Sequence, residues 1–214
     1  MAGVINKIVK TLIVSDLFLN FGWGLLSPVF ALFILSDFGV ANASQAAQIA
    51  GLASLFYWIP KSFFQIPIST YLDNKHGEKD DFWFMVCGLI IVSVVPIGYF
   101  FANVPWHIYV LQVIYAFGMA MTIPSWSAIF TRHIDKGKEA FEWSMKSNSV
   151  GMGAGIAGGL SGIVAANFGF GFLLTFVSLF TLVAASLLLI VKNNVFIRDG
   201  HPTVYAGERP IIEP

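Results

Sequence analysis

Six long apolar stretches dominate this chain of 214 residues, and each is long enough to cross a membrane. A helix needs roughly 20 apolar residues to span the hydrocarbon core of a bilayer. Lipid offers no partner to backbone amides and carbonyls, so each span has to satisfy them internally, as an α-helix does. The sequence therefore predicts an all-α, polytopic membrane protein with six transmembrane helices, at residues 11–35, 46–71, 82–102, 108–130, 145–166 and 170–191.

The composition supports a membrane protein and argues against several other classes. Hydrophobic residues make up 57% of the chain and charged residues 11%, whereas a soluble domain has about 25% charged residues. The net charge is zero, so no basic surface for nucleic acid is expected. The four histidines are scattered, without metal-ligand spacing. We therefore expect no enzyme activity, no cofactor, no metal and no nucleic-acid partner, and the lipid bilayer as the surroundings.

The basic residues predict how the chain is oriented. Eleven of the 12 lysines and arginines precede the first span, follow the sixth, or lie at the connections between spans two and three and between spans four and five. Positive residues gather on the cytoplasmic side of membrane proteins. We expect a multi-pass protein of the cytoplasmic (inner) membrane, with a cytoplasmic N-terminus at residues 1–10 and a cytoplasmic tail at residues 192–214.

Lys61 is the one basic residue deep inside a span. It lies ten residues from the cytoplasmic end of span two, which is ~15 Å at 1.5 Å per residue. A charge at that depth is costly and normally faces a bundle interior or a wet cavity. Ser54, Trp58 and Gln65 fall on the same face of the predicted helix as Lys61. Span two is therefore predicted to present a polar stripe.

Span one repeats this spacing with Asp16, Asn20, Trp23 and Ser27. An acid and a base buried near each other would lower each other's desolvation cost, so Asp16 and Lys61 are candidates to converge. Three interpretations stay open: a structural ion pair that sets helix register, a substrate or ion pathway, and direct contact of Lys61 with an anionic substrate.

Span four carries a weaker polar line of Gln112, Tyr115, Thr122 and Trp126. It indicates either cavity lining or ordinary hydrogen bonding between helices. Spans three and six have few polar residues and are the candidates for lipid-facing positions.

Span five is rich in glycine, and its small residues recur at intervals of four. Such spacing lets two helix backbones approach closely. We expect another helix to pack against this face, which includes Gly151, Gly155, Gly158 and Gly159.

Three motifs, in order along residues 8–193, resemble those of the major facilitator superfamily. Between spans two and three that family has G-x-x-x-D-R-x-G-R-K. Here "STYLDNKHGEKD" supplies Asp73, Gly77 and Lys79, whereas Ser69 and Asn74 depart from the pattern.

The other two motifs lie in spans four and five. In span four the family often has R-x-x-x-G-x-G; "QVIYAFG" keeps Gly118 and has Gln112 in place of the arginine. In span five the family pattern is G-x-x-x-G-P-x-G-G. It is met, with Ile156 in place of proline, at Gly151, Gly155, Gly158 and Gly159.

The resemblance implies one six-helix half of a transporter that works by alternating access. Such a half lines a central cavity with spans one and four and faces its other half with spans two and five. A homodimer is the default partner arrangement, and pairing with another six-helix half is the alternative. A non-transporting scaffold or sensor with the same fold is the competing function.

Candidate residue roles complete this hypothesis. Secondary active transport of a small solute is expected, with proton coupling through Asp16 and with substrate contact through Asn20, Trp23, Lys61 and Gln65. At the cytoplasmic turn, Asp73 is expected to hold a gate by pairing with Arg132 or by capping a helix.

Overall fold

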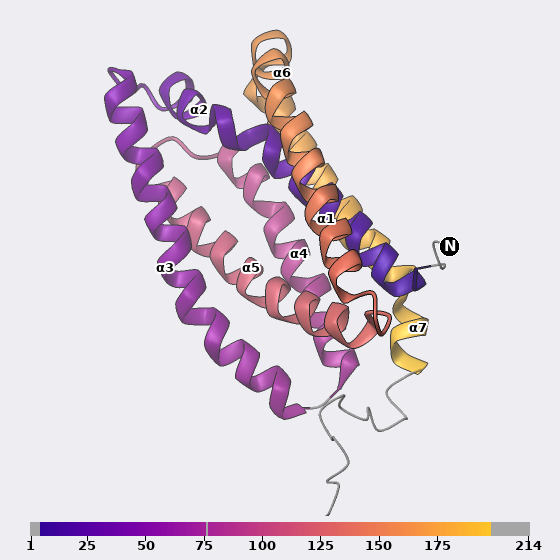
Figure 1. The fold of residues 1–214 in the computed structure, drawn as a ribbon. Helices are drawn as coiled ribbons and strands as arrows, with labels where there is room; N and C mark the ends of the chain where they lie inside the picture. The colour runs from indigo at the N-terminus through magenta and orange to yellow at the C-terminus, as the bar shows by residue number, and fades with distance from the viewer. Residues whose placement is uncertain (1–4, 76, 198–214) are drawn as a thin grey trace, which may run out of the picture.

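The computed structural model describes residues 5–75 and 77–197, and all the secondary structure in this part of the chain is helical (Figure 1). The predicted all-α class is therefore confirmed for these residues, while most of the predicted tail at 192–214 lies outside them. In chain order the elements are α1 (Lys7–Leu26), the 3-10 turn η1 (Ser27–Val29), α2 (Phe30–Asp37), α3 (Ala43–Lys75), α4 (Glu78–Phe100), α5 (Pro105–His133), α6 (Glu139–Leu189) and α7 (Lys192–Ile197).

The first membrane stretch is broken at Pro28. Proline has no backbone N–H, so it cannot donate to the carbonyl four residues earlier. The helix tightens into η1 at this point, and the amide of Ser27 donates to the carbonyl of Trp23 at the end of α1. The predicted single span at 11–35 is therefore two helices joined by a short turn.

α6 contains two arms that meet at Gly169. This residue has φ 78° and ψ 167°, a backbone conformation that residues other than glycine rarely adopt. In Figure 1 the chain runs to the upper end of α6, reverses, and returns beside its first arm toward α7. We call residues 139–168 the first arm and residues 170–189 the second arm; they correspond to predicted spans five and six.

Four helical stretches among the described residues are long and apolar enough to cross a membrane: Lys7–Asp37, Glu78–Phe100, Pro105–His133 and Glu139–Leu189. α3 has 33 residues but is not in this set, since residues such as Lys61 and Gln65 reduce its apolar character. α6 counts once although Gly169 divides it. The count of six spans, their boundaries and the side on which the termini lie stay predictions.

Small residues let the helices approach closely. A Cβ added to Gly118 on α5 would lie 2.8 Å from the carbonyl oxygen of Gly88 on α4. A Cβ added to Gly24 on α1 would lie 3.1 Å from the Cα of Ala154 on the first arm of α6. Contacts of this kind matter because lipid is as apolar as a leucine side chain, so packing rather than the hydrophobic effect holds membrane helices together.

Most of the glycine face predicted on span five points away from the other helices of the bundle. Nothing lies within 4 Å of a Cβ placed on Gly151, Gly155 or Gly159, whereas one on Gly158 would lie 3.6 Å from Pro28. Within the bundle the close contacts are made by Gly153 and its neighbours instead. The expectation that this face packs on another helix is therefore not met inside the described bundle, except at Gly158.

The lipid-facing assignment of spans three and six needs a similar correction. One side of α4 is buried, with Phe82, Leu89 and Val92 all at 2% exposure or less, and its other side is exposed. The second arm of α6 likewise buries Leu173, Val177 and similar residues. Low polarity in these spans therefore marks core packing as well as lipid contact.

Candidate functional site

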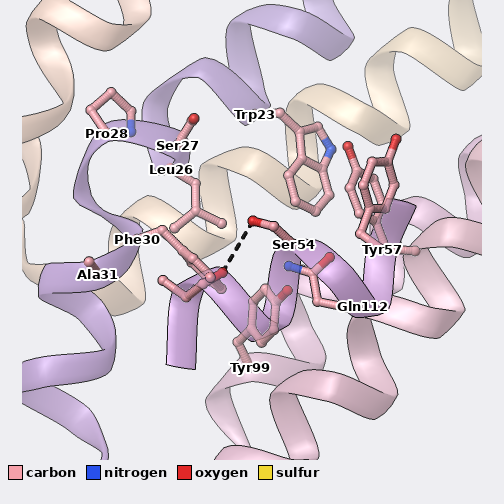
Figure 2. A pocket seen from close by; sticks show the side chains of 13 residues that line it. Trp23, Leu26, Ser27, Pro28, Phe30, Ala31, Ser54, Tyr57, Tyr99 and Gln112 are labelled. Atoms are coloured by element: carbon pink, nitrogen blue, oxygen red, sulfur yellow. Dashed lines mark hydrogen bonds between the residues drawn. The ribbon is translucent and has the colours of Figure 1, made fainter. Parts of the chain in front are cut away.

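A cavity of about 470 Å³ lies between α1, the η1–α2 segment, α3, α4 and α5. Figure 2 shows the break at Ser27 and Pro28 on one side of it and the rings of Trp23 and Tyr57 on the other, with Ser54 and Gln112 between. We call this cavity the aromatic pocket. The volume falls within the roughly 300–1,000 Å³ of small-molecule sites. The lining residues are Trp23, Leu26, Ser27, Pro28, Phe30, Ala31, Ala50, Gly51, Ser54, Tyr57, Tyr99, Gln112 and Tyr115.

Three buried polar atoms at this cavity have no hydrogen-bond partner among the described residues. They are Nε1 of Trp23 on α1, the hydroxyl oxygen of Tyr99 on α4 and Oε1 of Gln112 on α5. Tyr99 is 2% exposed and Gln112 is 9% exposed. Leaving a buried polar group without a partner is costly, and all three of these residues line the aromatic pocket.

A stack of aromatic rings forms one wall. The ring centroids of Trp23 and Tyr115 lie 4.0 Å apart with planes 15° from parallel, and those of Tyr57 and Tyr115 lie 4.7 Å apart at 21°. Offset stacks of this kind are favourable contacts between rings. The stack joins α1, α5 and α3, so it connects three helices around the cavity.

A second, smaller cavity of about 110 Å³ lies nearer the end of the bundle that carries the α5–α6 connection. At its wall Asp16 Oδ2 lies 3.4 Å from Nζ of Lys146 on the first arm of α6. Asn20 donates to Asp16 Oδ1 at 2.9 Å, and Lys146 Nζ lies 5.1 Å from the ring centroid of Trp126. We call this the ion-pair pocket. It is smaller than typical ligand sites, and its mostly apolar wall carries the pair of Asp16 and Lys146.

The predicted convergence of Asp16 with Lys61 is corrected by these contacts. Asp16 pairs with Lys146, which the sequence left outside the candidate site. Lys61 Nζ instead lies 4.4 Å from the ring centroid of Trp58 and 5.7 Å from that of Tyr57. The packing of the helices explains this: α1 lies along α6, whereas α3 packs against α5 and α2 and not against α1. Lys61 therefore lies on aromatic rings of its own helix, away from Asp16.

The predicted polar stripes divide between the two cavities. Trp23 lines the aromatic pocket, whereas Asp16 lines the ion-pair pocket and Asn20 bonds to it. On α5 the same division separates Gln112 and Tyr115 from Thr122 and Trp126.

Gln65 lies outside both cavities, and its backbone carbonyl accepts a hydrogen bond from Ser69.

The predicted gate at the α3–α4 connection has different partners from those expected. Arg132 pairs with Asp81, a buried carboxylate in the first turn of α4, rather than with Asp73. Asp73 is exposed on the last turn of α3. Gly77 precedes α4 in an extended conformation, and Lys79 Nζ lies 5.7 Å from the ring centroid of Phe196 on α7.

A buried histidine belongs to the same corner. His133 Nε2 lies 3.6 Å from Glu78 Oε2, and the carbonyl of His133 accepts a hydrogen bond from Asn6. Together with the pair of Arg132 and Asp81, these contacts tie the ends of α1, α4 and α5 to one another.

Sequence reasoning missed Tyr99, Tyr57 and Lys146. Tyr99 lies near the end of an apolar helix, where a tyrosine reads as an interfacial anchor. Tyr57 precedes the predicted stripe residue Trp58, and a small change in the assumed face would have found it. Lys146 lies at the start of predicted span five, close to other basic residues, so nothing in the sequence distinguished it from a surface charge.

The comparisons with known proteins agree with the fold. The model of the Major Facilitator Superfamily matches residues 12–205, which is most of the chain. A search of curated proteins gives no match. The helical bundle, its apolar helices and this family match together show that the chain belongs to the major facilitator superfamily, whose members transport solutes across membranes.

Proposed function

We propose that this chain carries a small solute across the cytoplasmic membrane by alternating access, and that the aromatic pocket receives the solute. The observation that carries the proposal is the set of three unpartnered buried polar atoms, on Trp23, Tyr99 and Gln112, at a single cavity of about 470 Å³. A membrane bundle has no need of such a cavity for stability. Family membership supports the same function.

We further propose that the bundle works with a second six-helix half, by default another copy of the chain. Two surfaces support this arrangement. The glycine face of α6, at Gly151, Gly155 and Gly159, leaves open space for a neighbouring backbone. α3 exposes Ile59 and Phe63, which are 53% and 77% exposed. In Figure 1 these two helices lie on opposite sides of the bundle, where each is free to meet the other helix of a partner.

Cross-linking between copies tests the homodimer. Cys87 is exposed and is first replaced by alanine. Two tagged copies are then coexpressed, one with Phe63→Cys and the other with Gly159→Cys, so that a heterologous disulfide arises only between chains. The homodimer predicts this product, and a pair of Val94→Cys with Gly159→Cys is the control because exposed Val94 lies on α4. An absent product, or one no stronger than the control, contradicts the homodimer and favours pairing with a different half.

Proton coupling is proposed at the ion-pair pocket. Asp16 and Lys146 join α1 to the first arm of α6, and a proton on the carboxylate would remove the charge that holds Lys146. Ionisable groups inside membrane segments form the proton relays of pumps and transporters. Asp16 is the proposed proton carrier, and Lys146 is its partner when the carboxylate is ionised.

Flux in liposomes tests transport itself. The purified protein is reconstituted and given an isotopically labelled mixture of small metabolites, with and without a proton gradient. Gly51→Phe is the matched blocked variant: Gly51 lines the aromatic pocket and a Cβ there meets nothing within 4 Å. The added ring is expected to extend into the cavity and obstruct it. Val94→Phe, outside the pocket, controls for the added ring. Accumulation that Gly51→Phe abolishes supports the carrier.

The competing proposal is a membrane scaffold or sensor that keeps the fold without transport. It predicts no flux above that of the Gly51→Phe variant, in either the presence or the absence of a gradient. The same reconstitution therefore separates the two functions.

A further inference from the structure

We propose that the aromatic pocket is selective for uncharged solutes that carry several hydroxyl groups or comparable donors and acceptors. This inference names the substrate class of the site proposed above and rests on that proposed function. It is drawn from the side chains of the pocket, from the types of their unpartnered atoms and from the position of Lys61.

No charged side chain is among the 13 residues that line the pocket. An ion moved from water into such a cavity would lose its hydration and find no counter-charge, at a cost well above that of burying a neutral polar group. Asp16 and Lys146 form an ion pair, but they line the separate ion-pair pocket. An anion or a cation in the aromatic pocket would therefore remain unpaired.

Aromatic walls alone would also suit an organic cation, because cations bind over ring faces. Here the faces are already engaged. Tyr115 stacks on both Trp23 and Tyr57, and Lys61 Nζ lies 5.7 Å from the ring centroid of Tyr57. A second cation at this wall would be repelled by the positive charge of Lys61. It would also find the ring faces occupied by other groups. The stack therefore offers its edges, with their polar atoms, more readily than its faces.

The unpartnered atoms define what a neutral solute has to supply. The indole N–H of Trp23 needs an acceptor, and the carbonyl oxygen of Gln112 needs a donor. The hydroxyl of Tyr99 takes either. A hydroxyl group can both donate and accept, so hydroxyl groups of a solute can pair with each of the three atoms. A hydroxyl can also pair with Gln112 if the amide is flipped, so that its nitrogen takes the place of its oxygen. These groups come from α1, α4 and α5, and one bound solute would link three helices.

Protection of a cysteine in the pocket tests this selectivity. Ser54 lines the cavity and its hydroxyl donates to the carbonyl of Ala50 on its own helix, so Ser54→Cys should fold. In a Cys87→Ala background, alkylation of Ser54→Cys by an uncharged maleimide is timed in the presence of single solutes at millimolar concentration. The probes are glucose, mannitol and uridine as neutral solutes, glucosamine and choline as cations, and gluconate and glucose 6-phosphate as anions.

The expected result is that at least one neutral probe slows alkylation and that its charged analogues do not. Tyr99→Phe and Gln112→Leu should each weaken that protection about tenfold, the effect of one lost hydrogen bond to a buried group. Tyr109→Phe, whose ring stacks on Phe56 away from this cavity, should leave it unchanged. Protection by a charged probe equal to that of its neutral analogue, or no protection by any neutral probe, overturns the inference.

Failure of this inference is distinguishable from failure of the carrier. The protecting probe is also supplied in labelled form to liposomes. Protection without flux sustains the pocket chemistry and contradicts transport. Flux of a charged metabolite that Gly51→Phe blocks sustains transport and contradicts the neutral selectivity.

Discussion

The aromatic pocket and the ion-pair pocket lie along the same two helices, α1 and α5, yet they differ in size and in charge. The aromatic pocket is about 470 Å³ and has no charged residue in its lining. The ion-pair pocket is about 110 Å³ and is built around Asp16 and Lys146. One cavity therefore carries a paired charge, and the other carries neutral polar groups without partners. The proposed division between proton coupling and solute binding rests on this difference.

The largest expected effect is at the ion-pair pocket. Asp16→Asn keeps the size of the side chain and removes its ability to lose a proton. Accumulation against a gradient should then be lost, while exchange of the same solute across the liposome membrane continues, because the aromatic pocket is untouched. Uptake with and without a proton gradient measures both. Accumulation that stays gradient-driven in Asp16→Asn would remove the proposed division.

The next largest effect is on stability. Lys146→Ala leaves the carboxylate of Asp16 without its cation. Loss of one member of a fully buried pair costs about 3–5 kcal/mol; the two side chains here are 29% and 15% exposed, so we expect the lower end or below. The melting temperature in detergent measures the loss. The double variant Asp16→Asn with Lys146→Ala should regain most of it, and no recovery would show that the pair is not the cause.

A smaller, local effect is expected from Tyr99→Phe. The ring stays and the hydroxyl is removed, so the change deletes one unpartnered polar atom from the aromatic pocket. Solute affinity should fall about tenfold, with the thermal stability of the empty protein unchanged or raised. Titration calorimetry with the protecting neutral probe measures it. An equal loss of gradient coupling would mean that the two pockets do not act separately.

The smallest effect concerns Lys61. A cation over an aromatic ring contributes about 0.5–1 kcal/mol at exposed sites. Lys61→Ala should therefore raise the affinity of the aromatic pocket for cationic probes about threefold. The alkylation assay with glucosamine measures it, and Lys61→Arg, which retains the charge, is the control. Improved binding of anions instead would contradict the role assigned to this charge.

Local patterns predicted which segments are helical and which of their faces are polar, but not how those faces meet. Trp23, Gln112 and Tyr115 were predicted as cavity residues, and the structure brings all three to one cavity. The partner of Asp16 was predicted on α3 and lies on α6. Periodicity places residues on the same face of one helix, but it does not give the rotation of that helix relative to its neighbours.

The glycines of α6 show the same limit. Their spacing predicts close packing, yet Gly151, Gly155 and Gly159 face open space while Gly24 and Gly118 make close approaches inside the bundle. The break at Pro28 was not predicted. A missing backbone donor does not by itself mark a break, because prolines also lie inside the continuous helices α3, α4 and α5.

By itself, the sequence determined that this chain is a bundle of membrane helices of the transporter family. A single apolar segment in lipid satisfies its own amides and carbonyls when it is helical, and the motif order supports the family. Only the tertiary structure decided that Asp16 meets Lys146 and that Trp23, Tyr99 and Gln112 share a cavity. Those contacts depend on how the packed helices are rotated and spaced. Rotation and spacing are determined jointly by contacts between segments far apart in the sequence.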